Sequence, residues 1–163
     1  MTEMNDKDRA DYFHHGFVAV DGLWFMKLEE RLGFDTALEI DNEVWKILPK
    51  IQARKMKELK KASNGNDALL ECFTTRLTME GFTFKIEKDE KANAFKLIID
   101  FCPWHNGMIK SGRQCLSAKV GEIICQSDYG TWAKEFACRF HLDSQNRICN
   151  GAKLCILHFN STG

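Results

Sequence analysis

Apolar residues recur at three- and four-residue steps along the first 62 positions, which is the spacing of amphipathic helices. One such series ends before Gly33, and another runs from residue 37 to 48. Pro49 follows directly, and we expect it to kink this second helix because proline removes a backbone hydrogen bond. After a polar loop, a third series covers residues 69–77. These patterns predict a helical first part of the chain.

After Gly81 the apolar residues alternate with polar ones, which is the period of a strand with one buried face. A polar turn at 89–93 separates two such runs, and Asn150-Gly151, a favoured turn dipeptide, separates two more. A helical series lies between the two pairs. The predicted elements are, in order, a strand at 82–86, its return strand at 95–102, a helix at 117–136, and strands at 138–142 and 153–159.

Two hairpins supply a four-stranded antiparallel sheet, and the apolar helices are available to cover its buried face. We therefore predict an α+β fold. The chain has 163 residues, 44% of them hydrophobic, a length that suits one domain with its own core. We expect a single domain over 1–163, with a helical part at 1–80 and a hairpin–helix–hairpin part at 81–160.

The charges balance at 23 basic and 23 acidic residues, and no long basic block marks a nucleic-acid partner. The first residues are polar, unlike a secretory signal, and no apolar run approaches the length of a membrane span. We therefore expect a cytoplasmic protein that binds neither nucleic acid nor membrane. In that reducing compartment the seven cysteines are expected as thiols or metal ligands, not as disulfides.

Four cysteines fall in the predicted hairpin–helix–hairpin part. Cys102 closes a strand, Cys125 lies within the helix, Cys149 precedes the turn, and Cys155 enters the last strand. A helix lying across the sheet would bring them together, as a tetrahedral zinc site requires. The spacing is not that of paired C-x-x-C motifs, so buried inert thiols are the alternative. The other three are expected in the core or as incidental thiols: Cys72, Cys115 and Cys138.

Three short motifs in this part carry a resemblance. They are Cys102-Pro103-Trp104, Cys125-Gln126-Ser127-Asp128-Tyr129, and Asn150-Gly151 followed by Cys155-Ile156-Leu157-His158-Phe159. Together they resemble the C-terminal pattern of the L-2-amino-thiazoline-4-carboxylic acid hydrolase family. The resemblance implies a small hydrolase that opens an amino-thiazoline ring with water to give a carbamoyl-cysteine. Asp128 and a metal or a thiol would activate the water.

The same segment is similar to the vinyl-reductase-type (4-vinyl reductase) ligand-binding domains of aromatic-sensing regulators. Those domains hold zinc with three cysteines and a glutamate, and Cys125, Cys149 and Cys155 match the cysteines. Asn146 stands where the glutamate is expected, so Cys102 is the replacement ligand. This resemblance implies a non-catalytic module for a small apolar or aromatic ligand. Separately, residues 21–45 resemble an uncharacterised prokaryotic family with cysteine-rich C-terminal halves, which implies no activity.

With these resemblances we predict metal binding by Cys102, Cys125, Cys149 and Cys155, with zinc as the metal and an iron–sulfur cluster as the alternative. A zinc ion closed by four thiolates has no open position for water and would be structural. If Cys102 is not a ligand, three cysteines leave a position for a water of lowered pKa. The sequence leaves both arrangements open.

The candidate catalytic residues are Asp128, Cys125 and His105, and the candidate ligand contacts are Tyr129, Trp132 and Trp104. Asp128 follows Cys125 by three residues on one helix face, where it is a general base or, alternatively, a structural carboxylate. His105 is a loop residue that either reaches a ligand or is merely solvated. Two functions remain, a small hydrolase and a binding or sensor module. Either takes a small molecule, and a homodimer is left open.

Overall fold

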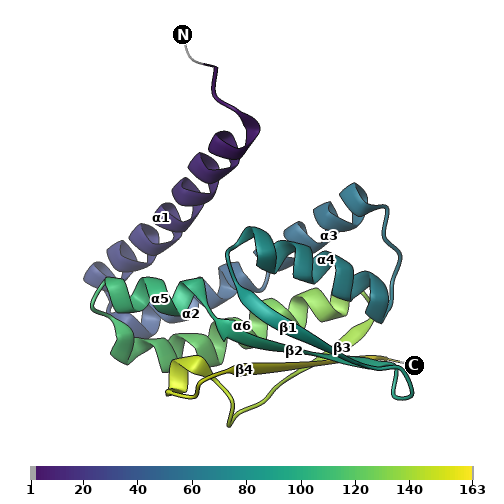
Figure 1. The fold of residues 1–163 in the computed structure, drawn as a ribbon. Coiled ribbons are helices and arrows are strands. Elements are labelled where there is room, and N and C mark those ends of the chain that lie inside the picture. The colour runs from purple at the N-terminus through teal and green to yellow at the C-terminus, as the bar shows by residue number, and fades with distance from the viewer. Residues whose placement is uncertain (1–2, 163) are drawn as a thin grey trace. The chain divides into compact units, whose positions relative to one another are not determined.

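The computed structural model describes residues 3–162 (Figure 1). Helices dominate the first half and a four-stranded antiparallel sheet follows, which confirms the predicted α+β class. The chain packs as two compact units, Met1–Glu43 and Val44–Gly163. The sequence predicted an internal boundary at residue 80, at the end of the helical part. The packing boundary lies earlier, so helices belong to both units.

The first unit consists of the long helix α1 (Asp6–Leu32) and most of α2 (Phe34–Trp45). Asn5 caps α1, because its side chain accepts a hydrogen bond from the backbone N–H of Asp8 at 2.8 Å. Gly33 ends α1 with φ of 83°, a conformation that glycine adopts without strain. The Phe25 and Phe34 rings then meet edge to face, 5.9 Å apart.

The helix predicted to kink at Pro49 is in fact interrupted. α2 ends at Trp45, and a new helix, α3 (Leu48–Lys60), begins with Pro49 in its first turn. Proline is well tolerated there, because the amide it lacks would have no partner within the helix. The kink prediction was therefore wrong, since the same proline that disfavours a helix interior favours a helix start.

The second unit holds the sheet (Figure 1). Its strands lie in the order β1-β2-β4-β3, so that the first hairpin joins the second through the pairing of β2 with β4. All pairings are antiparallel. The strands are β1 (Thr83–Asp89), β2 (Ala94–Phe101), β3 (Cys138–Leu142) and β4 (Cys155–Ser161).

The connection between β3 and β4 is longer than the tight turn that the sequence predicted. It contains a short 3-10 helix, Ile148–Asn150, and Gly151 ends that helix with φ of 89°. Asn150-Gly151 therefore turns the chain within a loop and does not join the strands directly. The loop matters for function because it carries Cys149.

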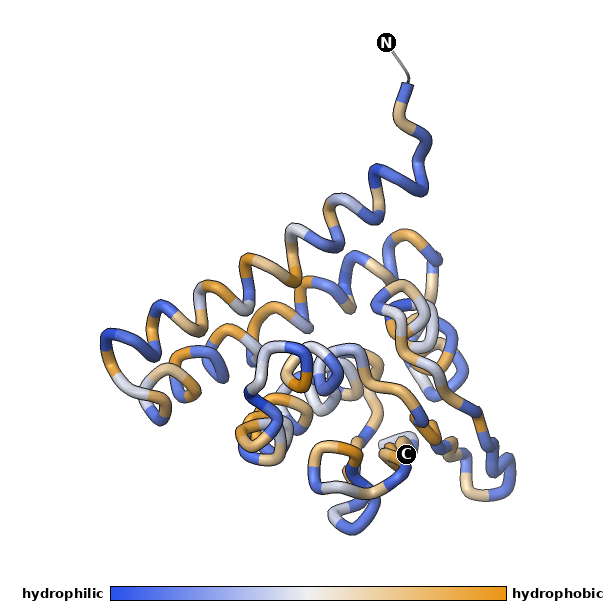
Figure 2. Tube along the Cα trace, turned by 60° about the vertical axis from the view of Figure 1, so that its left-hand side comes forward, coloured by the Kyte–Doolittle hydropathy of each residue, from blue (hydrophilic) through white to orange (hydrophobic). Residues whose placement is uncertain are grey.

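Two helices, α4 (Asn66–Met79) and α6 (Ser117–Glu135), contribute the side chains that bury one face of the sheet. Alternate residues of β2 and β4 point into this core, among them Leu97 and Leu157. Aromatic rings fill its centre, where Phe73 lies 5.4 Å from Phe159 and 5.5 Å from Trp132. Figure 2 shows hydrophobic positions recurring along these elements and along α1.

One helix was missed by the sequence analysis. α5 (Pro103–Lys110) follows β2 directly, with Pro103 in its first turn and Cys102 as its N-cap. The signal was the proline itself, which favours the first position of a helix. The segment was interpreted instead as a strand end and loop. In the part from residue 3 to 162, no helix is both long and apolar enough to cross a membrane.

Replacing Phe73 tests the core. Phe73→Ala removes a fully buried ring that contacts three other aromatic rings. We expect the free energy of unfolding to fall by about 3–5 kcal/mol, because the cavity left behind cannot collapse completely. Met79→Ala on the same helix, at an exposed position, should change it by less than about 0.5 kcal/mol. Urea denaturation measures both, and equal losses would contradict this packing.

Candidate functional site

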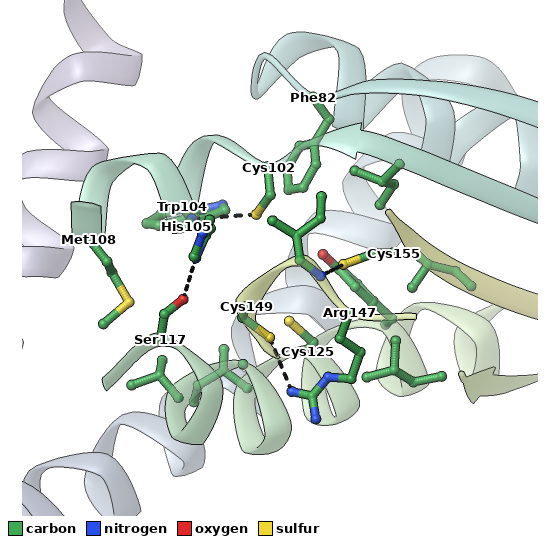
Figure 3. Close-up of a pocket in the computed structure, with 18 residues that line it drawn as sticks. Phe82, Cys102, Trp104, His105, Met108, Ser117, Cys125, Arg147, Cys149 and Cys155 are labelled. Atoms are coloured by element: carbon green, nitrogen blue, oxygen red, sulfur yellow. Dashed lines mark hydrogen bonds between the residues drawn. The ribbon is translucent and has the colours of Figure 1, made fainter. Parts of the chain in front are cut away.

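Four cysteines line a single cavity of about 90 Å³ in the second unit (Figure 3). They are Cys102 after β2, Cys125 on α6, Cys149 in the 3-10 helix, and Cys155 at the start of β4. The other three cysteines do not line it, and all seven are free thiols. The structure thus brings together the four cysteines that the sequence analysis selected, from segments that are far apart in the chain.

The position of each sulfur follows from the fold. Cys155 lies two residues before Leu157 on β4, so both side chains point to the same face of the sheet, the one that the core covers. Its register partner is Ile99 on β2, and the end of that strand leads into Cys102. His158 falls on the opposite face, where its ring lies 6.0 Å from that of His141. Strand alternation therefore separates these two histidines from the cavity.

Gly121 allows α6 to approach the loop that carries Cys149. A Cβ atom at position 121 would lie 3.0 Å from the Cys149 sulfur and 3.5 Å from Nη2 of Arg147. The first distance is shorter than an ordinary van der Waals contact, so any larger residue would push the sulfur away. Gly121 precedes Cys125 by one helical turn. The glycine therefore admits Cys149 to the helix face that carries Cys125.

Three of the four sulfurs accept hydrogen bonds from N–H groups. The backbone N–H of His105 donates to Cys102 at 3.5 Å, and that of Ile148 donates to Cys155 at 3.1 Å. The side chain of Arg147 donates to Cys149 at 3.4 Å. Donors of this kind stabilise a sulfur that carries negative charge.

Arg147 is a buried cation, only 6% exposed. Its guanidinium donates to the Ala118 carbonyl at 3.4 Å and to the Cys149 sulfur. Within residues 3–162 no carboxylate forms an ion pair with it. A buried charge is costly unless an opposite charge compensates it, and a thiolate at Cys149 would supply that charge.

The surroundings of Cys102 and Cys125 favour the protonated thiol. Burial raises the pKa of Cys102 to about 11, and neighbouring thiolates at Cys155 and Cys149 would raise it further against the backbone hydrogen bonds. Burial also raises the pKa of Cys125 well above its usual value, with the charges of the other three cysteines adding to the effect. Deprotonating Cys102 and Cys125 therefore requires a compensating positive charge.

The rest of the cavity wall is mainly apolar, with Arg147 beside Cys149 and a polar pair, His105 and Ser117, at another place (Figure 3). Nδ1 of His105 lies 2.7 Å from the hydroxyl oxygen of Ser117, a hydrogen bond that fixes the imidazole. The sequence analysis selected His105 but missed Ser117, because nothing local marks a serine at a helix start as a partner. Trp104 and Tyr129 also line the cavity, whereas Trp132 is fully buried in the core and does not.

Asp128 does not line the cavity. Its two oxygens accept hydrogen bonds from Nη1 and Nη2 of Arg76 at 2.7 and 2.8 Å, and Nε of Arg76 donates to Glu80 at 2.7 Å. Burial alone would lower the pKa of Arg76, but the charges of Asp128 and Glu80 and their hydrogen bonds raise it above its usual value. This arrangement favours the structural alternative for Asp128. The sequence did not reveal Arg76, which lies 52 residues away.

Within residues 3–162, no three or more histidine, cysteine, aspartate or glutamate side chains converge closely enough, as they are oriented, to hold a metal ion. The chemistry of the donors nevertheless suits a soft cation, because four thiols face one apolar space with N–H donors behind three of them. Each cysteine can reorient its sulfur by rotating a single side-chain torsion.

Fold and site together define an α+β protein with a cysteine-lined cavity. The chain belongs to DUF6125, a family of unknown function, whose model matches residues 9–141. The matched region contains Cys102 and Cys125 and ends before Cys149 and Cys155. No curated protein matches the chain.

The ion pair of Asp128 generates a prediction. Arg76→Leu leaves the buried carboxylates of Asp128 and Glu80 without a counter-charge, and we expect it to cost about 3–5 kcal/mol of unfolding free energy. Adding Asp128→Leu to the same chain should recover part of that loss, because one uncompensated charge is removed. Urea denaturation at neutral pH compares the variants. A double variant no more stable than Arg76→Leu would argue against a structural pair.

Proposed function

We propose that this is a cytoplasmic metal-binding protein in which Cys102, Cys125, Cys149 and Cys155 together bind one zinc ion. The observation that carries the proposal is the convergence of these four thiols on one apolar cavity. They come from four separate elements, so no local sequence constraint brings them together. A buried thiol can be inert by itself, but four in one cavity form the donor set of a structural zinc site.

Charge supports the same conclusion. Four thiolates around a divalent ion carry a net charge of about −2, which a buried site tolerates only with compensation. Arg147 supplies one positive charge at the Cys149 sulfur, and the N–H groups of His105 and Ile148 donate to two other sulfurs. Burial raises the pKa of Cys102 and Cys125, and a bound cation would lower it again, because the cation favours the thiolate that burial disfavours.

The proposed site is structural, since four thiolates leave no position for a substrate water. It would fasten the loop between β3 and β4 to α6 and to the end of β2. The cavity that these four cysteines line, about 90 Å³, is smaller than the cavity of about 150 Å³ that accommodates benzene. We therefore propose that, with the ion bound, the cavity admits no ligand as large as benzene. An iron–sulfur cluster is the alternative occupant of the same four cysteines.

Metal analysis tests this proposal. Protein purified anaerobically, without chelator or metal-affinity tag, should contain one zinc ion per chain and show no visible absorption. Cys149→Ser should lose the ion, whereas Cys115→Ser, which changes an exposed thiol outside the cavity, should retain it. A broad visible band with iron and sulfide would establish the cluster in place of zinc. Absence of any metal, or its retention in Cys149→Ser, would overturn the four-cysteine site.

Two glycine substitutions on α6 sharpen the same test without removing a ligand. Gly121→Ala places a methyl group 3.0 Å from the Cys149 sulfur and should lower zinc occupancy. Gly130→Ala places one 4.0 Å from Phe140, an ordinary contact, and should leave occupancy unchanged. Both changes favour the helix by up to about 1 kcal/mol, so helix propensity cannot explain a difference between them. Equal zinc occupancy in both variants would mean that zinc binding does not depend on the present position of the Cys149 sulfur.

The second candidate function is hydrolysis of a small heterocyclic substrate, as the resemblance to the thiazoline hydrolases implies. The hydrogen bond between His105 and Ser117 favours it, because it holds an imidazole at the wall of the cavity. In this reaction His105 would accept the proton of an attacking water. Asp128 is engaged with Arg76 and would act only through the fold.

Turnover of an amino-thiazoline carboxylate tests the second candidate. If His105 is the base, His105→Gln should slow formation of the carbamoyl-cysteine product by about 100-fold or more. His141→Gln, on the opposite face of the sheet, should have no effect. Chromatography of the product gives the rates. No turnover by the unmodified protein, or equal turnover by both variants, would remove this candidate and leave the metal site unaffected.

A further inference from the structure

Two histidines lie side by side on the face of the sheet that points away from the core. His141 on β3 and His158 on β4 are register partners, and the centroids of their rings lie 6.0 Å apart. The neighbouring partners on these strands, Phe140 and Phe159, contact the core, so alternation directs the two imidazoles to the other face. Both strands belong to the second unit, so the separation of the rings is set within that unit. We call His141 and His158 the histidine pair.

The ring nitrogens of the histidine pair have no structural role in the fold. Within residues 3–162, neither side chain forms a hydrogen bond or an ion pair, and each contacts the ring of the other. His141 is exposed and His158 is half-buried. In contrast, Nδ1 of His105 is engaged with the hydroxyl of Ser117 at 2.7 Å. The nitrogens of the histidine pair are therefore available to a ligand.

The separation of the two rings suits a divalent metal ion. Imidazole is the commonest protein ligand for metals, and it suits zinc, copper and nickel in particular. Zinc–nitrogen bonds of about 2.0–2.1 Å place the centroids of two imidazoles about 5 Å apart on one tetrahedral ion. The centroids of the histidine pair are 6.0 Å apart, which is longer by only about 1 Å. Rotation about the side-chain torsions can close that gap while the strands stay in place.

Asp143 supplies a negative charge beside the histidine pair. It follows the end of β3, two residues after His141, and therefore lies on the same face. Hydrogen bonds from the side chain of Asn146 and from the backbone N–H groups of Gln145 and Asn146 hold the pKa of Asp143 below its usual value, and a positive charge at His158 lowers it further. The carboxylate thus stays charged where it can attract a cation or accept a hydrogen bond from a metal-bound water.

Two basic side chains share this face, and neither places a strong opposing charge at the pair. Lys96, the register partner of His158 on β2, forms an ion pair with Glu87 at 2.6 Å. Arg139 lies two residues before His141 and is exposed, so water and salt screen its charge. The carboxylate of Asp143 offsets that charge from the other side of His141.

We propose that His141 and His158 bind a divalent metal ion such as zinc, in a second site separate from the four-cysteine cavity. The histidines supply two ligands and water supplies the others, because within residues 3–162 no third histidine, cysteine or carboxylate converges with them. Water ligands leave this ion open to exchange, unlike an ion enclosed by four thiolates. A bound ion would link β3, an edge strand, to β4. This inference does not rest on the function proposed for the cavity.

Titration with zinc tests the histidine pair. The full chain, as purified, is titrated with zinc chloride at pH 7.5 by isothermal calorimetry, and the bound metal is counted after equilibrium dialysis. We expect one ion per chain beyond any that the protein already holds. His141→Gln and His158→Gln should each weaken its binding by about 10-fold or more, because each removes one of two protein ligands. His15→Gln, at an exposed position of α1, should leave the binding of this ion unchanged.

Two further measurements examine the surroundings of the added ion. Asp143→Asn keeps an acceptor for the hydrogen bonds of the loop but removes the charge, so it should weaken zinc binding less than the loss of either histidine. Saturating zinc should also raise the midpoint of thermal unfolding, because a ligand that binds only the folded state stabilises it. His158→Gln should abolish this rise at the same zinc concentration. Far-UV circular dichroism confirms that each variant is folded.

Several outcomes would overturn the proposal. Absence of an additional ion would do so, as would unchanged binding in both His141→Gln and His158→Gln. Loss of the added ion in His15→Gln would assign it to α1 instead. Cys149→Ser separates this site from the cavity: it should still bind the added ion, whatever metal the cavity holds. Loss of the added ion in that variant would mean that the zinc enters the cavity and not the histidine pair.

Discussion

The need to bury one face of the sheet determines most of this structure. Leu97 on β2 and Leu157 on β4 are register partners, and both point into the core that α4 and α6 complete. Because side chains alternate along a strand, burying Leu157 also turns Cys155 inward. The pairing of Ile99 with Cys155 then brings the end of β2, and with it Cys102, to the same place. The cysteine cavity is thus a consequence of how the core is closed.

Two buried arginines in the second unit illustrate different uses of a charge. Arg76 lies between Asp128 and Glu80 at 2.7 to 2.8 Å, so its charge is compensated within the fold. Arg147 is almost as deeply buried, but its neighbours are a carbonyl oxygen and a thiol. The first arrangement is complete without any further group. The second becomes favourable when the thiol ionises, which is what binding of a cation would bring about.

The sequence predicted features that depend on local periodicity and missed those that depend on tertiary contacts. The strand at 82–86 and the helix at 117–136 were predictable from local spacing, because apolar residues recur every two positions in the first and at three- and four-residue steps in the second. The helix starts at Pro49 and Pro103 were not predicted, because proline can either end a helix or begin one. Tertiary packing decides between the two roles. The convergence of the four cysteines was foreseeable because Cys102, Cys125 and Cys155 lie on predicted elements and Cys149 lies beside a predicted turn. Arg147 and Ser117 were not, because burial alone distinguishes them from ordinary surface residues.

The proposed zinc site would also be coupled to folding. Cys102 and Cys155 come together only when β2 pairs with β4, and Cys149 reaches them only when its loop packs against Gly121. In the unfolded chain Cys102 and Cys125 are distant in sequence from each other and from the Cys149–Cys155 segment, so little of the site exists there. A ligand that binds the folded state alone adds its binding free energy to stability. That contribution would fall chiefly on the loop between β3 and β4, whose regular structure is limited to the 3-10 helix that carries Cys149.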